Sequence, residues 1–271
     1  MFNKLNLALP ISNGMIITTE MVKELRDTTG VSVMQCKKAL EESDGDMETA
    51  LILLRKQSSA SAAKKSDRTL GAGLINVKDG ADKTAVITLL CETDFVAKND
   101  DFVALVNTLT DLALTEGTDE VSAKAKEMID PLVQKIGENI QLGTTAVLAG
   151  STVGSYNHNG KNAAVVVLEG GNKDLARDIA MHVTAMYPRF TTVADISEDD
   201  KVKVTELFTA EVNESDKPAE MKAKILQGKL DTYFKEYTLV EQNFIKDPSK
   251  TIGQLLKEAG ASIVSFTQFT V

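Results

Sequence analysis

The chain has 271 residues, enough for two domains of ordinary size and a small additional module. With 43% hydrophobic and 25% charged residues, it has the composition of a soluble globular protein. A formal net charge of −9 disfavours a protein whose main task is to bind phosphate backbones, so we expect no direct contact with nucleic acid.

The amino-terminal residues 1–14 are expected to be a dispensable extension. Their apolar stretch is short and contains Pro10, and it has neither an arginine nor a small-residue cleavage site. These features disfavour a signal peptide and a transit peptide. No apolar run in the chain is long enough to span a bilayer, and Cys36 and Cys91 lack the spacing of a zinc site or a disulfide framework. We therefore expect a cytoplasmic protein without membrane contact.

Residues 15–57 are predicted to form three short helices. Thr18 or Thr19 can cap the first helix, and Gly30 can end it. Three helices of this length form a small bundle that is marginally stable alone. Residues 58–70 begin with a stretch rich in Ser, Ala and Lys, which predicts a helical or flexible tether.

The middle of the chain shows the same order of elements twice. Residues 73–90 predict a β-hairpin with its turn at Asp79-Gly80, and residues 101–114 predict an amphipathic helix. Residues 153–168 and 173–186 repeat this order. We therefore expect an α+β fold with two similar antiparallel-sheet-plus-helix subdomains, the first in residues 71–150 and the second in residues 151–197 and 238–271.

Residues 198–237 interrupt the second subdomain. Apolar residues recur at helical spacing on both sides of Pro218, which suits the first turn of a helix. Two amphipathic helices joined by a short loop form an antiparallel hairpin. Beyond it, the last strands are expected at residues 238–245 and 261–271, with a short helix at residues 251–259 between them. A further helix is expected at residues 122–136.

Candidate catalytic groups are few. The chain has two histidines, His158 in a predicted hairpin turn and His182 in a predicted helix, and neither pairs with a nucleophile in a known pattern. The position of His182 is typical of a packing residue. Gly154–Lys161 superficially resembles a phosphate-binding loop, but its glycine spacing is one residue too long and it joins two strands. We therefore predict no enzyme active site, no metal site and no cofactor.

The connection that follows the first hairpin is the strongest candidate for function. It places Asp94 and Phe95 side by side, between a buried strand and a helix. Two interpretations of Phe95 remain open at this point. The ring packs into its own core, as most loop phenylalanines do, or it serves as an aromatic anchor for a partner's pocket.

Seven short motifs follow one another along the chain from about Met15 to the end: Leu25–Gly30, Met34–Leu40, Thr93–Lys98, Lys135–Ile140, Gly154–Tyr156, Ile179–Val183 and Asp247–Leu256. Together and in this order they resemble the elongation factor Ts family. The sequence departs from the family's pattern at Gln35, where Asp is usual, and in residues 141–145, which lack the usual arginines.

The resemblance implies that this protein is not an enzyme and exchanges GDP for GTP on elongation factor Tu, binding its GDP-bound and nucleotide-free forms. It also implies that the amino-terminal bundle is UBA-like and that residues 198–237 are a protruding coiled-coil hairpin. Phe95 would enter a pocket of the GTPase, and Asp94 would disturb the region around its magnesium ion, with Thr93 and Val96 beside them. Further contacts with the partner are implied for Arg26, Val33, Met34, Ile136, Gly137, His182 and Ile245. A homodimer and a two-to-two complex both remain open.

Two other classes of protein compete with this interpretation. A ubiquitin-type binding module on an unrelated scaffold would explain the three-helix bundle but neither the Asp94-Phe95 segment nor the duplication. A metabolic α+β enzyme would need a cluster of titratable residues around a pocket, and the sequence indicates none.

Overall fold

The computed structural model describes residues 17–215 and 217–271. The chain divides into two compact units. The first unit consists of Met1–Leu70 with Lys126–Gln141, and the second of Gly71–Ala125 with Leu142–Val271. The expectation that residues 1–14 are dispensable lies outside the described residues.

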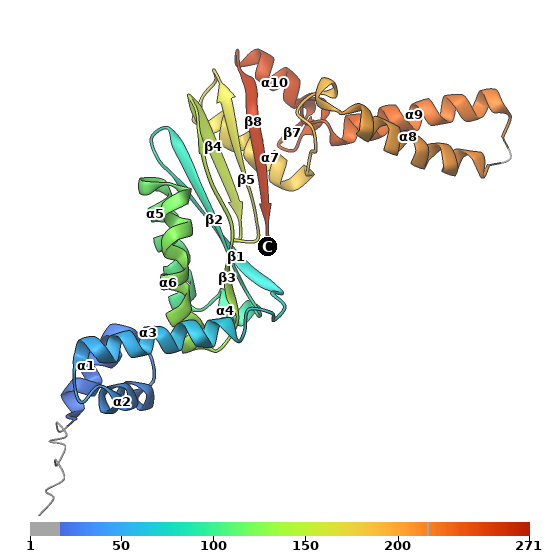
Figure 1. Ribbon diagram of the computed structural model, residues 1–271. Coiled ribbons are helices and arrows are strands. Elements are labelled where there is room, and N and C mark those ends of the chain that lie inside the picture. Colours follow the sequence, from blue (N-terminus) through green and yellow to red (C-terminus); the bar gives the residue numbers. More distant parts are fainter. Residues whose placement is uncertain (1–16, 216) are drawn as a thin grey trace, which may run out of the picture. The chain divides into compact units, whose positions relative to one another are not determined.

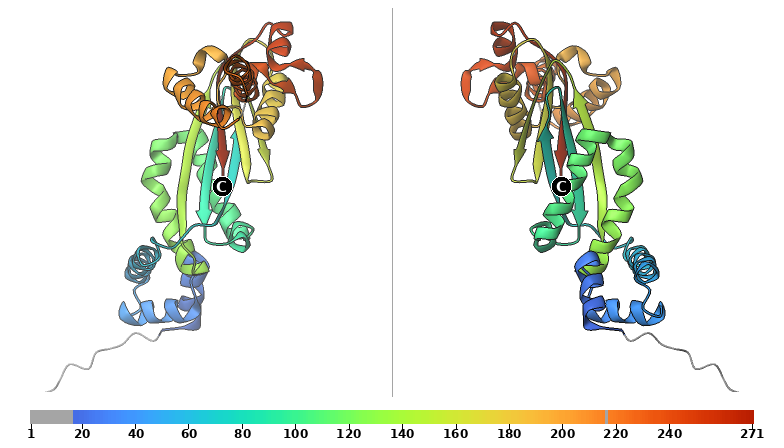
Figure 2. Two further views of the ribbon diagram at one scale, coloured as in Figure 1. Left: turned by 90° about the vertical axis from the view of Figure 1, so that its right-hand side faces the viewer. Right: turned by 90° about the vertical axis from the view of Figure 1, so that its left-hand side faces the viewer.

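Three helices form the amino-terminal part of the first unit: α1 (Thr19–Thr29), α2 (Val33–Glu42) and α3 (Met47–Ala63). Thr18 caps α1 by accepting the N–H of Met21, and Gly30 ends that helix with a φ of 68°, a value that glycine adopts without strain. Figure 2 shows the three helices packed together. Their shared core consists of Leu25, Val31, Cys36, Ala39, Leu40, Ala50 and Leu54.

The third helix is longer than the sequence suggested. The expected boundary at residue 57 falls inside α3, which continues to Ala63. Its last turns pack on α6 (Thr118–Ile136), where Ser59 Oγ donates to Asp130 Oδ2 at 2.5 Å and Ser58 Oγ donates to Gln134 Oε1. Small side chains permit this close helix contact, so the Ser- and Ala-rich stretch is a packed helix end and not a free tether.

The first sheet of the second unit has the strand order β1-β2-β3. The expected hairpin is formed by β1 (Ala72–Asp79) and β2 (Lys83–Cys91), which pair antiparallel. Helix α5 (Asp100–Glu116) packs on both strands. The third strand, β3 (Ile140–Ala149), was not expected, because its sequence lacks the regular alternation that marks a half-buried strand.

The second sheet repeats this arrangement with the order β4-β5-β8. Strands β4 (Thr152–His158) and β5 (Asn162–Glu169) form the second hairpin, and β8 (Ser262–Thr270) pairs antiparallel with β5. Helix α7 (Lys173–Met186) covers this sheet (Figure 1) and buries Ile179 and Val183 against it. The predicted order of hairpin followed by helix is confirmed in both halves.

Helices α8 (Glu198–Asn213) and α9 (Ala219–Tyr237) lie side by side in the segment that interrupts the second half, as Figure 1 shows. The 3-10 turn η1 (Val193–Asp195) precedes them. An ion pair between Lys229 and Glu211, at 2.7 Å, joins the two helices. They form the helical hairpin that the apolar pattern predicted.

The strand expected at residues 238–245 is wrong. That segment forms the 3-10 turn η2 (Leu239–Glu241) and the two-residue strand β6 (Asn243–Phe244), which pairs with β7 (Asp247–Thr251) ahead of α10 (Ile252–Glu258). Leu239 and Phe244 are buried in the core under α7. The apolar residues of this segment therefore indicated burial in a core. The segment reaches that burial without forming a long strand.

Candidate functional site

The connection between β2 and α5 contains one turn of helix, α4 (Asp94–Ala97). Thr93 caps this turn, because its hydroxyl accepts the N–H of Val96 at 3.4 Å. The buried thiol of Cys91 donates to the carbonyl oxygen of Thr93 at 3.2 Å and so supports the start of the turn from below. This supporting role of Cys91 was not predicted from the sequence, because a single cysteine forms no spacing pattern that points to a function.

Phe95 lies on the solvent side of α4. Its side chain is 88% exposed, whereas the next two residues, Val96 and Ala97, are only 7% and 5% exposed. A single helical turn can bury only one side, and these two smaller residues occupy it. The interpretation of Phe95 as a core residue is therefore wrong for the free protein.

Asp94, the first residue of α4, is exposed and forms an ion pair. Its Oδ1 lies 2.7 Å from Lys161 Nζ in the turn between β4 and β5. The hydrogen bond from Lys161 lowers the pKa of the Asp94 carboxyl below its ordinary value, and the positive charges of Lys161 and Lys98 act in the same direction. The carboxylate is thus held in its charged form. No local pattern predicted this partner for Asp94, because 67 residues separate the two side chains.

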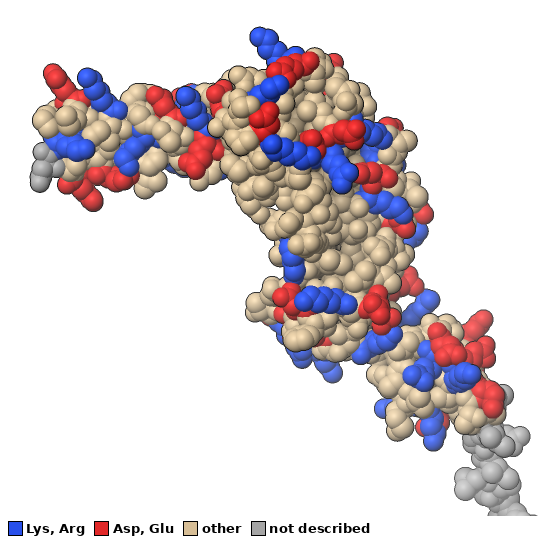
Figure 3. Space-filling model, turned by 180° about the vertical axis from the view of Figure 1, so that it is seen from behind, with Lys and Arg blue, Asp and Glu red and all other residues tan. Residues whose placement is uncertain are grey.

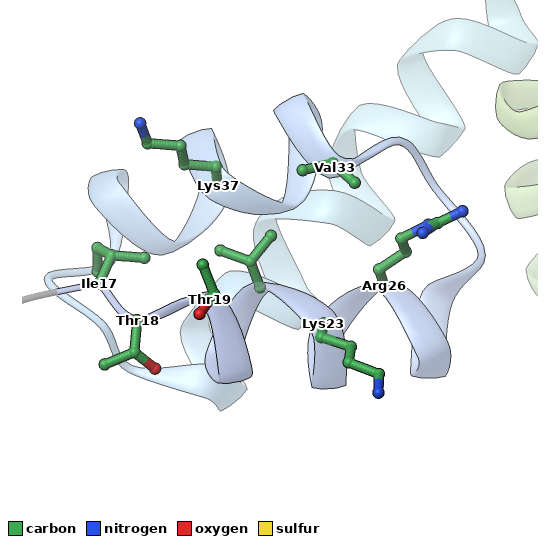
Figure 4. A pocket seen from close by; sticks show the side chains of 8 residues that line it. Ile17, Thr18, Thr19, Lys23, Arg26, Val33 and Lys37 are labelled. Carbon is green, nitrogen blue, oxygen red and sulfur yellow. The ribbon is translucent and has the colours of Figure 1, made fainter.

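A groove on the first unit contains two of the other predicted residues. Arg26 of α1 and Val33 of α2 both line it, and Val33 is 50% exposed. Figure 4 shows the sticks of these two side chains on neighbouring helices. Met34 follows on the solvent side of α2 at 75% exposure. The complete lining is Ile17, Thr18, Thr19, Val22, Lys23, Arg26, Val33 and Lys37, which combines apolar side chains with three cations.

Ile136 and Gly137, also in the first unit, follow each other at the end of α6. Ile136 is half-buried, and Gly137 is exposed with a φ of 91°. This is a left-handed conformation that disfavours any residue with a side chain. The two residues therefore form a bend of defined backbone conformation at the surface, directly after α6.

His182 is fully buried on α7 in the second unit. The backbone N–H of Ile245 donates to its Nδ1 at 3.3 Å, and its Nε2 lies 2.9 Å from Gln242 Oε1. Burial lowers the pKa of His182, so the ring is neutral, with its proton on Nε2 facing the amide oxygen. The direct partner contact expected of His182 is therefore corrected: the ring holds the backbone of Ile245, which is half-buried.

Charged side chains of both signs are interspersed on the face of the molecule shown in Figure 3, including the α8–α9 hairpin. The described residues contain no group of three or more His, Cys, Asp or Glu side chains placed to bind a metal ion. In the same residues, no helix is both long enough and apolar enough to cross a membrane. Among the large hydrophobic side chains of the described residues, Phe95 is the most exposed.

Comparisons with known proteins place these residues in a family. A family model described as elongation factor TS matches residues 92–271. The elongation factor Ts of Hahella chejuensis is 40% identical over 262 residues, which cover 94% of this chain and 92% of that protein. The proteins of that name from Marinobacter nauticus and Pasteurella multocida are 41% and 40% identical, each over 94% of this chain and over 91% and 92% of their own lengths. The chain belongs to the elongation factor Ts family.

The region that matches the elongation factor Ts model begins at Glu92, directly before α4. It therefore includes the exposed turn with Asp94 and Phe95, together with α7 and the α8–α9 hairpin. The full-length relatives extend the similarity over the first unit as well. As a member of the elongation factor Ts family, the chain is a guanine-nucleotide exchange factor of translation elongation.

Proposed function

We propose that this chain binds elongation factor Tu, in its GDP-bound and nucleotide-free states, and that the α4 turn drives GDP release. The observation that carries the proposal is the 88% exposure of Phe95 on a turn whose next two residues, Val96 and Ala97, are buried. An exposed phenylalanine ring contributes nothing to the folding free energy through burial, but it can bury roughly 150–250 Å² of its surface in a partner's pocket. Aromatic anchors of this kind dominate the energy of protein interfaces.

Asp94 supplies the second element of this mechanism. Its carboxylate stands beside Phe95 and is kept charged by Lys161. A magnesium ion clamps the phosphate oxygens of a bound nucleotide through a few oxygen ligands. A carboxylate that the Phe95 anchor brings near this ion disturbs those ligands and weakens the hold on GDP. Because coupling between two ligands is reciprocal, GDP weakens the binding of this chain by the same factor.

The first unit provides a second attachment point. Its groove combines apolar residues with Lys23, Arg26 and Lys37, and Val33 and Met34 are exposed nearby. We propose that this surface, on a UBA-like bundle of α1, α2 and α3, binds the same GTPase molecule. Attachment at one point raises the effective concentration of the other contact. Ile136, Gly137 and Ile245 are proposed to extend the contact surface, and His182 to support Ile245.

The remaining segments are proposed as follows. Residues 64–70 connect the end of α3 to the core subdomains, which span residues 71–125 with 142–150 and residues 151–197 with 238–271. The α8–α9 hairpin, residues 198–237, is the coiled-coil insert. We place the protein in the cytoplasm, where translation factors act.

The test is release of fluorescent GDP from purified elongation factor Tu. We expect the full chain to accelerate release, and a variant with Asp94→Asn and Phe95→Ala to lose nearly all of this acceleration. Val264→Ala is a matched control, because Val264 is also an exposed apolar residue, at 63%, but lies on β8. Release that the folded wild-type chain leaves unchanged would contradict the proposal, and binding to ubiquitin instead would favour the ubiquitin-type module.

A further inference from the structure

Lys161 joins two segments that are far apart in the sequence. Its Nζ lies 2.7 Å from Asp94 Oδ1, across a sequence separation of 67 residues. It also donates to the carbonyl oxygen of Gly73 in β1 at 3.2 Å. The ammonium group is therefore directed by two acceptors toward the start of α4.

The turn that carries Lys161 is fixed against β1. The N–H of Ile75 donates to the carbonyl oxygen of Gly160 at 2.7 Å, and Asn157 Nδ2 donates to the carbonyl oxygen of Ile75 at 2.9 Å. Gly160 has a φ of 69°, and a Cβ at this position would lie 2.3 Å from a methyl carbon of Leu74. The turn thus approaches β1 as closely as a backbone without a side chain allows.

The backbone of Lys161 itself is held from both sides. Its N–H donates to the carbonyl oxygen of His158 at 3.1 Å, and its own carbonyl oxygen accepts the N–H of Val271 at 3.1 Å. The side chain of Lys161 therefore extends from a fixed base. An exposed aspartate on a short helical turn would otherwise rotate among several staggered conformations.

We propose that Lys161 is a positioning residue for nucleotide exchange: it holds Oδ1 of Asp94 so that the carboxylate meets the partner in one orientation. This inference rests on the role proposed for Asp94. The side chains of the pair are 38% and 64% exposed, and exposed ion pairs contribute little to folding stability. What the pair supplies is an ordered side chain at the contact surface, and pre-ordering lowers the entropy lost when a complex forms.

Two other roles for Lys161 predict different results. A latch that restrains Asp94 until the partner arrives would slow exchange, so removing the lysine would raise the rate. A lysine that contacts the partner directly would matter whether or not Asp94 keeps its charge. The proposal predicts a loss that depends on the Asp94 carboxylate.

The experiment is a double-mutant cycle in the GDP-release assay, with Lys161→Met, Asp94→Asn and the combined variant. Lys161→Met is expected to lower the second-order rate constant of exchange by about two- to tenfold, the effect of leaving one side chain unordered. In the Asp94→Asn background, Lys161→Met should have no further effect. Lys161→Arg should restore most of the rate, because it keeps the charge and the reach of the side chain.

Lys78→Met is the matched control, since Lys78 pairs with Asp111 on the surface of the same unit, away from α4. It should leave exchange unchanged. Faster exchange after Lys161→Met, an equal loss in both backgrounds, or no loss at all would overturn the inference. An Asp94→Asn protein with wild-type exchange would overturn the role of Asp94 itself and that of Lys161 with it. A defective Asp94→Asn protein beside a fully active Lys161→Met protein would overturn only the role of Lys161.

A second readout needs no partner. Carbon-13 NMR of the free chain can follow the titration of the Asp94 carboxyl. Lys161→Met should raise the pKa of Asp94 toward its ordinary value, with Lys98 left as the neighbouring charge, while the melting curve stays the same. An unchanged pKa would show that the ion pair does not form in solution and would overturn the inference independently of exchange.

Discussion

The two halves of the second unit differ at one connection. After the first hairpin, Glu92–Asn99 leads from β2 to α5 and contains the extra turn α4. After the second hairpin, only Gly170–Asn172 leads from β5 to α7. Gly170 and Gly171 have φ values of 76° and 66°, which allow the chain to turn at once into the helix.

Both connections end in the same way. Asn99 caps α5 by accepting the N–H groups of Asp101 and Phe102, and Asn172 caps α7 by accepting the N–H of Leu175 at 2.9 Å. A short link is therefore sufficient to build this hairpin-and-helix unit. The additional residues of the first connection are not needed for the architecture, and they are the residues that present Asp94 and Phe95.

Shortening the first connection should have the largest effect. Replacing Glu92–Asn99 by Gly-Gly-Asn, the sequence of the second connection, is expected to abolish the acceleration of GDP release, because α4 is gone. The melting temperature should also fall, since Val96 and Ala97 lose their buried positions. GDP release and thermal unfolding by circular dichroism measure both effects. A shortened chain that unfolds cooperatively and still accelerates GDP release would show that the extra residues of the first connection are not needed for exchange.

Removing one ring should separate function from stability. Phe95→Ala is expected to lower exchange at least about thirtyfold, which corresponds to roughly 2 kcal/mol, with almost no change in melting temperature. Phe102→Ala is the matched control, because this ring belongs to α5 and is fully buried. It should cost about 3–5 kcal/mol of unfolding free energy and lower the melting temperature by about 10 °C. A large loss of stability in Phe95→Ala would show that the ring packs in solution.

Between pH 5 and pH 7, the second half should give the fold a pH dependence through a buried histidine, a residue type that α5 of the first half does not contain. His182 has a lowered pKa in the folded state because it is buried. The unfolded chain, with a histidine pKa of about 6.5, binds the proton more readily. This contribution to stability is therefore present above about pH 6.5 and declines as the pH falls below it, by at most about 1.4 kcal/mol per pH unit.

Urea unfolding at pH 7 and pH 5 measures this effect. His182→Gln should flatten the difference between the two values of pH, even though the variant itself is less stable. His158→Gln, at the exposed last residue of β4, should keep the wild-type difference. A wild-type protein equally stable at both values would contradict the neutral, buried ring.

The two helix caps should show the smallest effects. Asn99→Ala and Asn172→Ala are each expected to lower the unfolding free energy by about 1 kcal/mol, because each removes one capping side chain. Only Asn99→Ala should also slow exchange, since it adjoins α4. Equal losses of exchange in both variants would show that the two connections do not differ in function, and urea unfolding beside GDP release distinguishes the cases.

Sequence patterns predicted the helices and hairpins well, because they depend on local spacing. The start of α1 at Thr18 and the bounds of α7 follow from caps and apolar periodicity that act within one or two turns. The segments that failed are those whose burial comes from distant neighbours. In β3, Gly143 lies against Thr88 of β2, so closely that a Cβ on residue 143 would be 2.3 Å from the hydroxyl oxygen of Thr88. No pattern in the local sequence predicts such packing.

The candidate site divides in the same way. The sequence by itself determined that Asp94 and Phe95 stand together in a connection after a buried strand, because adjacency and strand patterns are local properties. It left the direction of Phe95 open, because a one-turn helix can bury either side. Only the tertiary structure decided this, when Val96 and Ala97 took the buried positions and Lys161, 67 residues away, came to hold Asp94. Such contacts depend on how two sheets meet, which the spacing of residues along one strand does not encode.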